Sequence, residues 1–161
     1  METIPCNGMV ILCHRPYNEV TFPETHNAFS THEDNIFYPA SNHRTGFQAQ
    51  WNAGMRAFML DTHYLNDVDQ SAANVRFCHG DSSRGFSPCT YGNVDPWAWL
   101  GNLESEMQSE ERDVVTLLLF FFYLFPTFVE VVSRSSRSNY CSYIYIVVCL
   151  KNLKNKTQKT A

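Results

Sequence analysis

Lysine and glycine are missing from opposite parts of this sequence. Residues 1–119 contain no lysine, and their six arginines face fifteen aspartates or glutamates, a balance of −9. Residues 120–161 contain no glycine and a single acid, Glu130, and their balance is +5. All six histidines and all three tryptophans also precede position 120. Two segments that differ this much in composition are predicted not to share one fold.

The net charge, the residue composition and the short apolar runs disfavour several classes of protein. The net charge of −4 argues against a nucleic-acid partner. Charged residues make up 17% and hydrophobic residues 44%, which is enough apolar material for a core and argues against disorder. The apolar run 9–13 is too short for the core of a secretory leader, so no signal peptide is expected in the chain as written.

The six cysteines form no CxxC motif, which disfavours a zinc ribbon. Cys6 and Cys13 are close in sequence, as are Cys78 and Cys89, and loop-like residues lie between each pair. These spacings are typical of small disulfide loops and hence of an oxidising compartment. Four reduced thiols are the alternative that spacing leaves open.

Apolar periodicity predicts alternating strands and helices. The strongest signals come from strand 55–64, whose two faces alternate, and from strand 114–119, which is wholly apolar. Asp95-Pro96 is a good helix start. Crossovers of the observed length favour parallel pairing, and parallel strands end on one face, where chemistry collects. The expected order is strand 19–22, a helix around Phe47 and Trp51, strand 55–64, strand 75–78, a helix from Asp95 and strand 114–119.

Polar side chains follow the predicted strands. His26 and His79 each come just after a strand, and Asp61 and His63 lie near the end of strand 55–64, on the same face as Met59. Two imidazoles facing one pocket can serve as general base and general acid near neutral pH. Asp61 could orient one of them or bind a cation. A zinc site from the three histidines, or ordinary hydrogen-bonded loop histidines, are the alternatives.

The order of short motifs from residue 6 to residue 119 resembles one family. It is similar to the opening half of secreted phospholipase C-like phosphodiesterases, which belong to the phosphatidylinositol-specific phospholipase C X-domain superfamily. The motifs that carry the resemblance are Cys6-Asn7-Gly8, Cys13, Arg15-Pro16-Tyr17, the run 20–27 ending in Thr25-His26-Asn27, the strand 54–64, Val75–Gly80 and the strand 113–119.

The resemblance implies a distorted TIM barrel that acts as a phosphoric diester hydrolase in lipid metabolism. In it, a substrate hydroxyl attacks phosphorus and displaces an alkoxide. Carried over by motif, His26 would be the general base and His79 the general acid. Asn27 and Asp61 match two positions that hold Ca²⁺ in calcium-dependent members. His63 and Arg56, together with Asn27 and Asp61, are assigned supporting or orienting roles.

Three departures from the family pattern weaken the calcium site and the first turn. Glu24 stands where a glycine usually precedes the Thr-His pair, Met59 stands where calcium-dependent members carry glutamate, and Phe120 falls at the position of a fourth-strand acid. Two oxygen ligands cannot satisfy an ion that takes about 6–8. Calcium is therefore expected to bind weakly at best, and no other cofactor is assigned.

The sequence thus predicts an α/β protein, a truncated TIM barrel with about four of eight strands. Residues 6–119 would form the family domain, and 120–161 an unrelated apolar and basic tail from read-through or an alternative exon. The substrate would be a phospholipid or another phosphodiester, and activity is expected to be low. The alternatives are a non-catalytic lipid- or partner-binding fragment and a protein attached to a membrane surface by its tail. The resemblance implies secretion.

Overall fold

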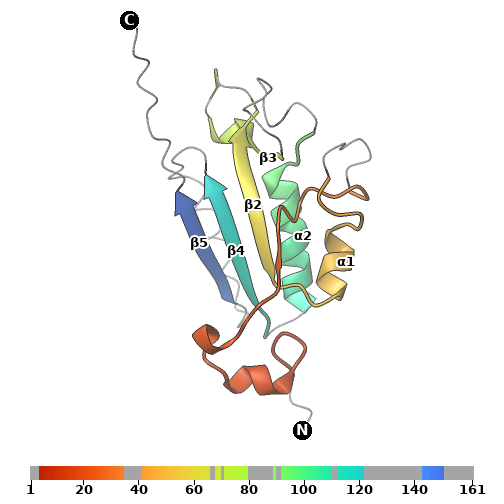
Figure 1. Ribbon diagram of the computed structural model, residues 1–161, viewed down its shortest axis with the longest axis vertical. Coiled ribbons are helices and arrows are strands. Elements are labelled where there is room, and N and C mark those ends of the chain that lie inside the picture. The colour runs from red at the N-terminus through yellow and green to blue at the C-terminus, as the bar shows by residue number, and fades with distance from the viewer. Residues whose placement is uncertain are drawn as a thin grey trace, which may run out of the picture.

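The computed structural model describes residues 4–34, 41–65, 68–69, 71–79, 89, 92–109, 112–121 and 143–150. The described strands form one open sheet, with two α-helices against it and the N-terminal 3₁₀ turns below it (Figure 1). The elements are η1 (Val10–His14), η2 (Tyr17–Glu19), β1 (Glu24–Thr25), α1 (Phe47–Asn52), β2 (Ala57–Tyr64), η3 (Ala72–Asn74), β3 (Val75–Phe77), α2 (Pro96–Ser109), β4 (Val114–Phe121) and β5 (Tyr143–Leu150).

The sheet has the order β1-β2-β4-β5, and all neighbours along this path are parallel. β3 pairs with the last residues of β2 in the antiparallel direction. The fold is therefore mixed α/β with an open sheet, as the alternation of elements predicted. A barrel is not shown by the described residues, and the truncated barrel stays a prediction.

The core lies between the sheet and the two helices. Phe58 and Leu60 of β2 are fully buried and pack in one cluster with residues of α1 and α2. Phe47 of α1 and Trp99 of α2 meet edge to face, with their ring centroids 5.0 Å apart. Met59 on the opposite face of β2 is only half-buried. Burial alternates with period 2 over residues 58–62, as predicted, whereas Ala57 and His63 on the other face are also buried.

The predicted helices are both present. Asp95 begins α2 as expected, because its carboxylate accepts hydrogen bonds from the backbone N–H groups of Trp97 and Ala98 at 2.7 and 3.4 Å. α1 is capped from outside, since Glu33 and Asp34 accept the backbone N–H groups of Gly46 and Phe47. None of the described helices has the length and apolar character needed to cross a bilayer.

The first strand was predicted at the wrong place. Residues 17–19 form η2, and only Glu24–Thr25 pair with β2. The register explains the difference, because Glu24 lies opposite Ala57, where β2 begins. The chain before Glu24 therefore runs past the start of β2 and has no β2 residue to pair with.

The direction of β3 also differs from the prediction. Thr62, His63 and Tyr64 pair with Phe77, Arg76 and Val75 in antiparallel register. Only ten residues, 65–74, separate the two strands, and three of them form η3. A parallel return needs a crossover of a dozen or more residues, so this short connection gives an antiparallel pair.

The predicted tail contributes one strand to the sheet, which differs from the prediction that the two segments do not share one fold. β5 pairs with β4 along its whole length, from Val114 opposite Tyr143 to Phe121 opposite Leu150. The uncharged stretch 114–129 begins as β4, and its remainder lies outside the described residues. The boundary between residues 119 and 120 and the unrelated origin of the tail stay predictions.

Both predicted disulfides are confirmed. Cys6 is bonded to Cys13 and Cys78 to Cys89, with Cα–Cα distances of 5.1 and 4.9 Å. The first closes the loop 6–13, which contains most of η1, at the base of the sheet, and the second ties the end of β3 to residue 89. Bridges of this kind are typical of proteins from oxidising compartments.

Candidate active site

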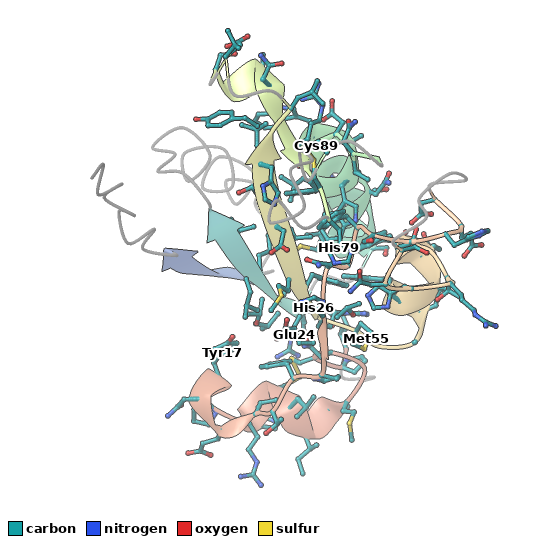
Figure 2. The ribbon with its side chains drawn as sticks, turned by 45° about the horizontal axis from the view of Figure 1, so that its top comes forward. Tyr17, Glu24, His26, Met55, His79 and Cys89 are labelled. Carbon is teal, nitrogen blue, oxygen red and sulfur yellow. A yellow bond between two sulfur atoms is a disulfide. The ribbon has the colours of Figure 1, made fainter. Side chains whose placement is uncertain are left out.

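One edge of β2 carries the segments that contain both catalytic candidates. On the β1 side, the chain turns after Thr25, and the backbone N–H of Ala28 donates to the carbonyl of Met59 at 3.0 Å. His26 lies in this turn and is exposed (Figure 2). The turn therefore places His26 beside the middle of β2.

The β3 side approaches the same edge from the opposite direction. The backbone N–H of Cys78 donates to the carbonyl of Asp61 at 3.3 Å, and His79 follows it. Because β3 is antiparallel to β2, its end leads back toward Met59 and the turn with His26. Figure 2 shows both labelled histidines in the central region of the molecule, between the sheet and α1. The sequence predicted that His26 and His79 lie at one place, but on the assumption that β3 is parallel to β2.

His26 is held by residues of the segment just before α1. The side-chain nitrogen of Asn42 lies 3.0 Å from its Nδ1, and Nε2 of His43 donates to its backbone carbonyl at 2.6 Å. Neither contact was predicted from the sequence. No local pattern pairs these residues, and the contact spans sixteen positions.

Asn27 is in an unusual state. Its φ is +48°, in the left-handed region that asparagine tolerates better than most residues. The side chain is 1% exposed, and neither its Oδ1 nor its Nδ2 has a hydrogen-bond partner within the described part of the chain. A buried amide without a partner costs about 1–3 kcal/mol. Such a group next to a candidate catalytic residue suits a ligand from outside the described residues.

His63 lies deeper, on the half-polar face of β2. The side chain is buried, and this burial is the main cause that lowers its pKa to about 4, with the charge of His79 adding to the effect. His63 is therefore neutral near pH 7.

The residues present supply few ligands for a metal ion. Asn27 and Asp61 are the two oxygen-bearing residues that the resemblance assigns to Ca²⁺, and the unpartnered Oδ1 of Asn27 suits such a role. Across the described ranges, however, no three His, Cys, Asp or Glu side chains are grouped so that they could hold a metal ion. The zinc alternative therefore finds no support there.

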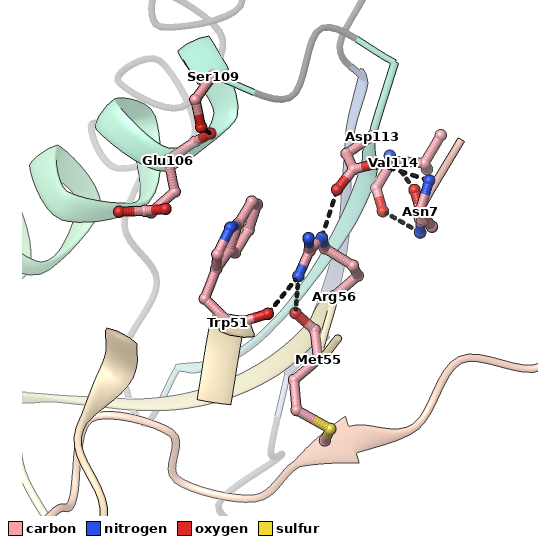
Figure 3. Close-up of polar contacts among 8 residues, drawn as sticks. All are labelled: Asn7, Trp51, Met55, Arg56, Glu106, Ser109, Asp113 and Val114. Atoms are coloured by element: carbon pink, nitrogen blue, oxygen red, sulfur yellow. Dashed lines mark hydrogen bonds and ion pairs between the residues drawn. The ribbon is translucent and has the colours of Figure 1, made fainter. Parts of the chain in front are cut away.

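Arg56 has a set of partners at the other end of β2. Its Nε donates to Asp113 at 2.5 Å, and its Nη1 donates to the carbonyls of Trp51 and Met55 (Figure 3). The guanidinium carbon also lies 3.6 Å from the centroid of the Trp51 ring. These contacts give Arg56 a structural role at the start of β2, and the orienting role assigned to it stays a prediction.

Asn7 completes this group, which we call the base network: Asn7, Arg56, Asp113 and Val114. The backbone N–H of Asn7 donates to Asp113 at 2.6 Å, and its side-chain amide exchanges two hydrogen bonds with the backbone of Val114 at 3.0 and 2.7 Å. The network joins the N-terminal disulfide loop to β2 and β4. A groove of about 160 Å³ lies in the same region and is lined by Asn7, Tyr17, Phe22, Val114 and neighbouring residues.

Comparison with known proteins identifies the family. A family model described as PI-PLC X 1 matches residues 12–141, which is most of the chain. The chain belongs to the PI-PLC X family. It is also 29% identical over 119 residues to an "Uncharacterized secreted protein" of Arthroderma benhamiae, a match that covers 73% of this chain and 23% of that protein. The chain thus spans about a quarter of this curated relative. No solved structure matches it.

Proposed function

We propose that this PI-PLC X chain carries the two-histidine part of a phosphodiesterase site. The observation that supports it best is the approach of the His26 turn and the end of β3 to one stretch of β2, at Met59 and Asp61. In the proposed reaction, a substrate hydroxyl attacks phosphorus and gives its proton to His26. The bond from phosphorus to the leaving oxygen breaks, and His79 donates a proton to that oxygen.

The substrate class would be a phospholipid or a related phosphodiester, by family membership. Asn27 would supply an amide oxygen close to the reacting groups, either to a cation such as Ca²⁺ or to a substrate donor. Secretion is proposed too, because the relative is named as secreted and the chain contains two disulfides.

We expect phosphatidylinositol turnover by this chain to be weak. Positioning of the substrate supplies several kcal/mol of a typical barrier, and the chain spans about a quarter of its relative. Purified protein should therefore turn over phosphatidylinositol little faster than a His26→Ala variant, with or without calcium. Turnover well above that control would show that the described half-site is sufficient.

A phosphodiester that keeps the attacking hydroxyl but has an aryl leaving group separates the two proposed roles. Such a group departs without a proton, so His79→Ala should leave this reaction nearly unchanged. His26→Ala should slow it by about 10²-fold, the lower end of the range for acid-base catalysis. His14→Ala is the matched control, because His14 is exposed in η1 at the base. Equal rates for all three variants would overturn the proposal.

A non-catalytic role in lipid or partner binding is the second candidate. It is favoured by the small set of metal ligands among the described residues, which leaves charge on a phosphoryl group without its usual stabiliser. Binding of phosphatidylinositol vesicles without turnover of either substrate would support this candidate over the first.

A further inference from the structure

The segment 41–43 forms a clamp on His26, which we call the Asn42 clamp. Its members, Asn42 and His43, contact His26 at two points: the ring Nδ1 and the backbone carbonyl. A carbonyl oxygen only accepts, so Nε2 of His43 carries the hydrogen of that second bond. Both the ring and the backbone of His26 are therefore held from one short segment.

The clamp is anchored on buried backbone. The N–H groups of Asn42 and His43 both donate to the carbonyl of Ser30, at 2.9 and 3.1 Å. The N–H of His32 in turn donates to the carbonyl of His43 at 2.9 Å. Ser30 has no exposed surface. These bonds tie the clamp to the turn that contains His26, so the two segments keep one relative position.

The chemistry of imidazole makes the Asn42 contact decisive. A neutral ring has one N–H and one lone pair, and a general base needs its lone pair on the nitrogen that faces the substrate. Nδ1 faces Asn42, so only Nε2 is left for the substrate. An Nε2 lone pair requires the ring hydrogen on Nδ1, and that hydrogen requires an acceptor beside it.

The side-chain amide of Asn42 can be that acceptor. As placed, its nitrogen faces Nδ1 at 3.0 Å, and the two ends of an amide have nearly the same shape. A half-turn of the amide brings Oδ1 to the same position. With the nitrogen inward, the ring hydrogen would sit on Nε2 and His26 could only donate to the substrate.

We propose that Asn42 is a positioning residue for His26, whose Oδ1 accepts the Nδ1–H and so keeps Nε2 free for the attacking hydroxyl. This inference rests on the proposed function, and it adds to it a residue outside the motifs that the family resemblance supplied. Asn42 itself does not touch the reacting atoms.

The test compares the ring hydrogen of His26 in several full-length proteins by ¹⁵N–¹H correlation NMR. The His26→Ala spectrum assigns the signals. Wild type and Asn42→Asp should show the hydrogen on Nδ1, because a carboxylate can only accept. Asn42→Leu, of similar size without polar atoms, should lose this preference. Asn102→Ala, at an exposed position on α2, is the control and should match wild type.

Kinetics with the aryl substrate give the second measurement. Asn42→Leu should lower kcat by about 10-fold or more with little change in KM, and Asn42→Asp should retain most of kcat. A hydrogen on Nε2 in wild type, or an unchanged ring hydrogen in Asn42→Leu, would overturn the inference.

The NMR result separates this inference from the proposed function. If His26→Ala slows turnover while Asn42→Leu changes neither turnover nor the ring hydrogen, the inference fails and the proposed function stands. If the ring hydrogen follows Asn42 but His26→Ala has no effect on turnover, Asn42 does fix the tautomer and the proposed function alone fails.

Discussion

Polar groups are paired at the start of β2 and are held at a cost in stability farther along the strand. At the start of the strand, every member of the base network has a partner: Arg56 bonds Asp113, and Asn7 bonds both Asp113 and Val114. Further along, Asn27 is buried with an unpartnered amide, and burial works against the charged form of His63. The first arrangement stabilises the fold, whereas the second costs stability.

Function is expected where polar groups are held at a cost in stability. Groups held in a costly state persist when a ligand or reaction uses them, and perturbed pKa values gather at such places. The buried ion pair of Arg56 is well satisfied and needs no such explanation. We therefore expect changes in the base network to act on folding. Changes at the histidine end, by which we mean His26, Asn27, His63 and His79, should act on chemistry.

The largest expected effect is at Asp113. Asp113→Ala would leave the buried guanidinium of Arg56 without its carboxylate, and breaking a buried pair in this way costs about 3–5 kcal/mol of unfolding free energy. Urea unfolding measures the change. The double variant Arg56→Met with Asp113→Ala should be less destabilised than the two single losses combined. A cost under about 1 kcal/mol would show that the base does not hold the fold together.

His63 should make stability depend on pH. Its folded pKa of about 4 is below the ordinary 6.5, so the unfolded chain binds this proton first. The contribution of neutral His63 to the unfolding free energy is therefore fully present above pH 6.5. It is lost as the pH falls toward 4, by at most about 3 kcal/mol.

His63→Gln removes this titration and is the control for it. The difference in unfolding free energy between wild type and His63→Gln should be constant above pH 7 and should change between pH 6.5 and 4. A difference independent of pH would contradict the burial argument and weaken the contrast between the two ends.

Removal of a disulfide should cost less. Replacing Cys6 and Cys13 by alanine should lower the unfolding free energy by about 2–3 kcal/mol, as loop entropy predicts for a short loop. Replacing Cys78 and Cys89 in the same way is the matched control, with a similar cost expected. Thermal unfolding in non-reducing buffer measures both.

The two bridges should also differ in how their removal combines with Asp113→Ala. The Cys6–Cys13 loop contains Asn7, which bonds Asp113, so its removal should not add independently to Asp113→Ala. Removal of the Cys78–Cys89 bridge should add independently, since that bridge lies at the other end. Equal coupling for both bridges would mean that the two ends are not separate.

The smallest effects come from two asparagines that share a backbone conformation. Asn7 and Asn27 have φ of +46° and +48°, which glycine adopts without strain. Asn7→Gly removes two hydrogen bonds to Val114 and should cost about 2 kcal/mol. Asn27→Gly removes an unpartnered amide and should change stability by less than about 1 kcal/mol.

Activity should show the reverse order. Asn27→Gly should lower turnover of the aryl substrate, while Asn7→Gly should leave it near wild type under conditions where both proteins are folded. If Asn27→Gly were as destabilising as Asn7→Gly, its amide would have partners, and the functional interpretation of the histidine end would lose one of its supports.

Features that depend on neighbouring residues could be predicted from the sequence. Alternation gave the two faces of β2, Asp95-Pro96 gave the start of α2, and the close spacing of the cysteines indicated both bridges. Short motifs in order gave the family. Each of these signals is local, because backbone periodicity, caps and short loops are set within a few residues.

Which distant groups meet depends on the tertiary structure and could not be predicted from local patterns. The direction of β3, the partners of Arg56 and the Asn42 contact with His26 depend on pairs of residues far apart in the chain, for which no local pattern exists. The lowered pKa of His63 likewise reflects burial by the assembled fold. Long-range contacts are chosen by packing and by the need to pair buried polar groups, and these are properties of the whole fold.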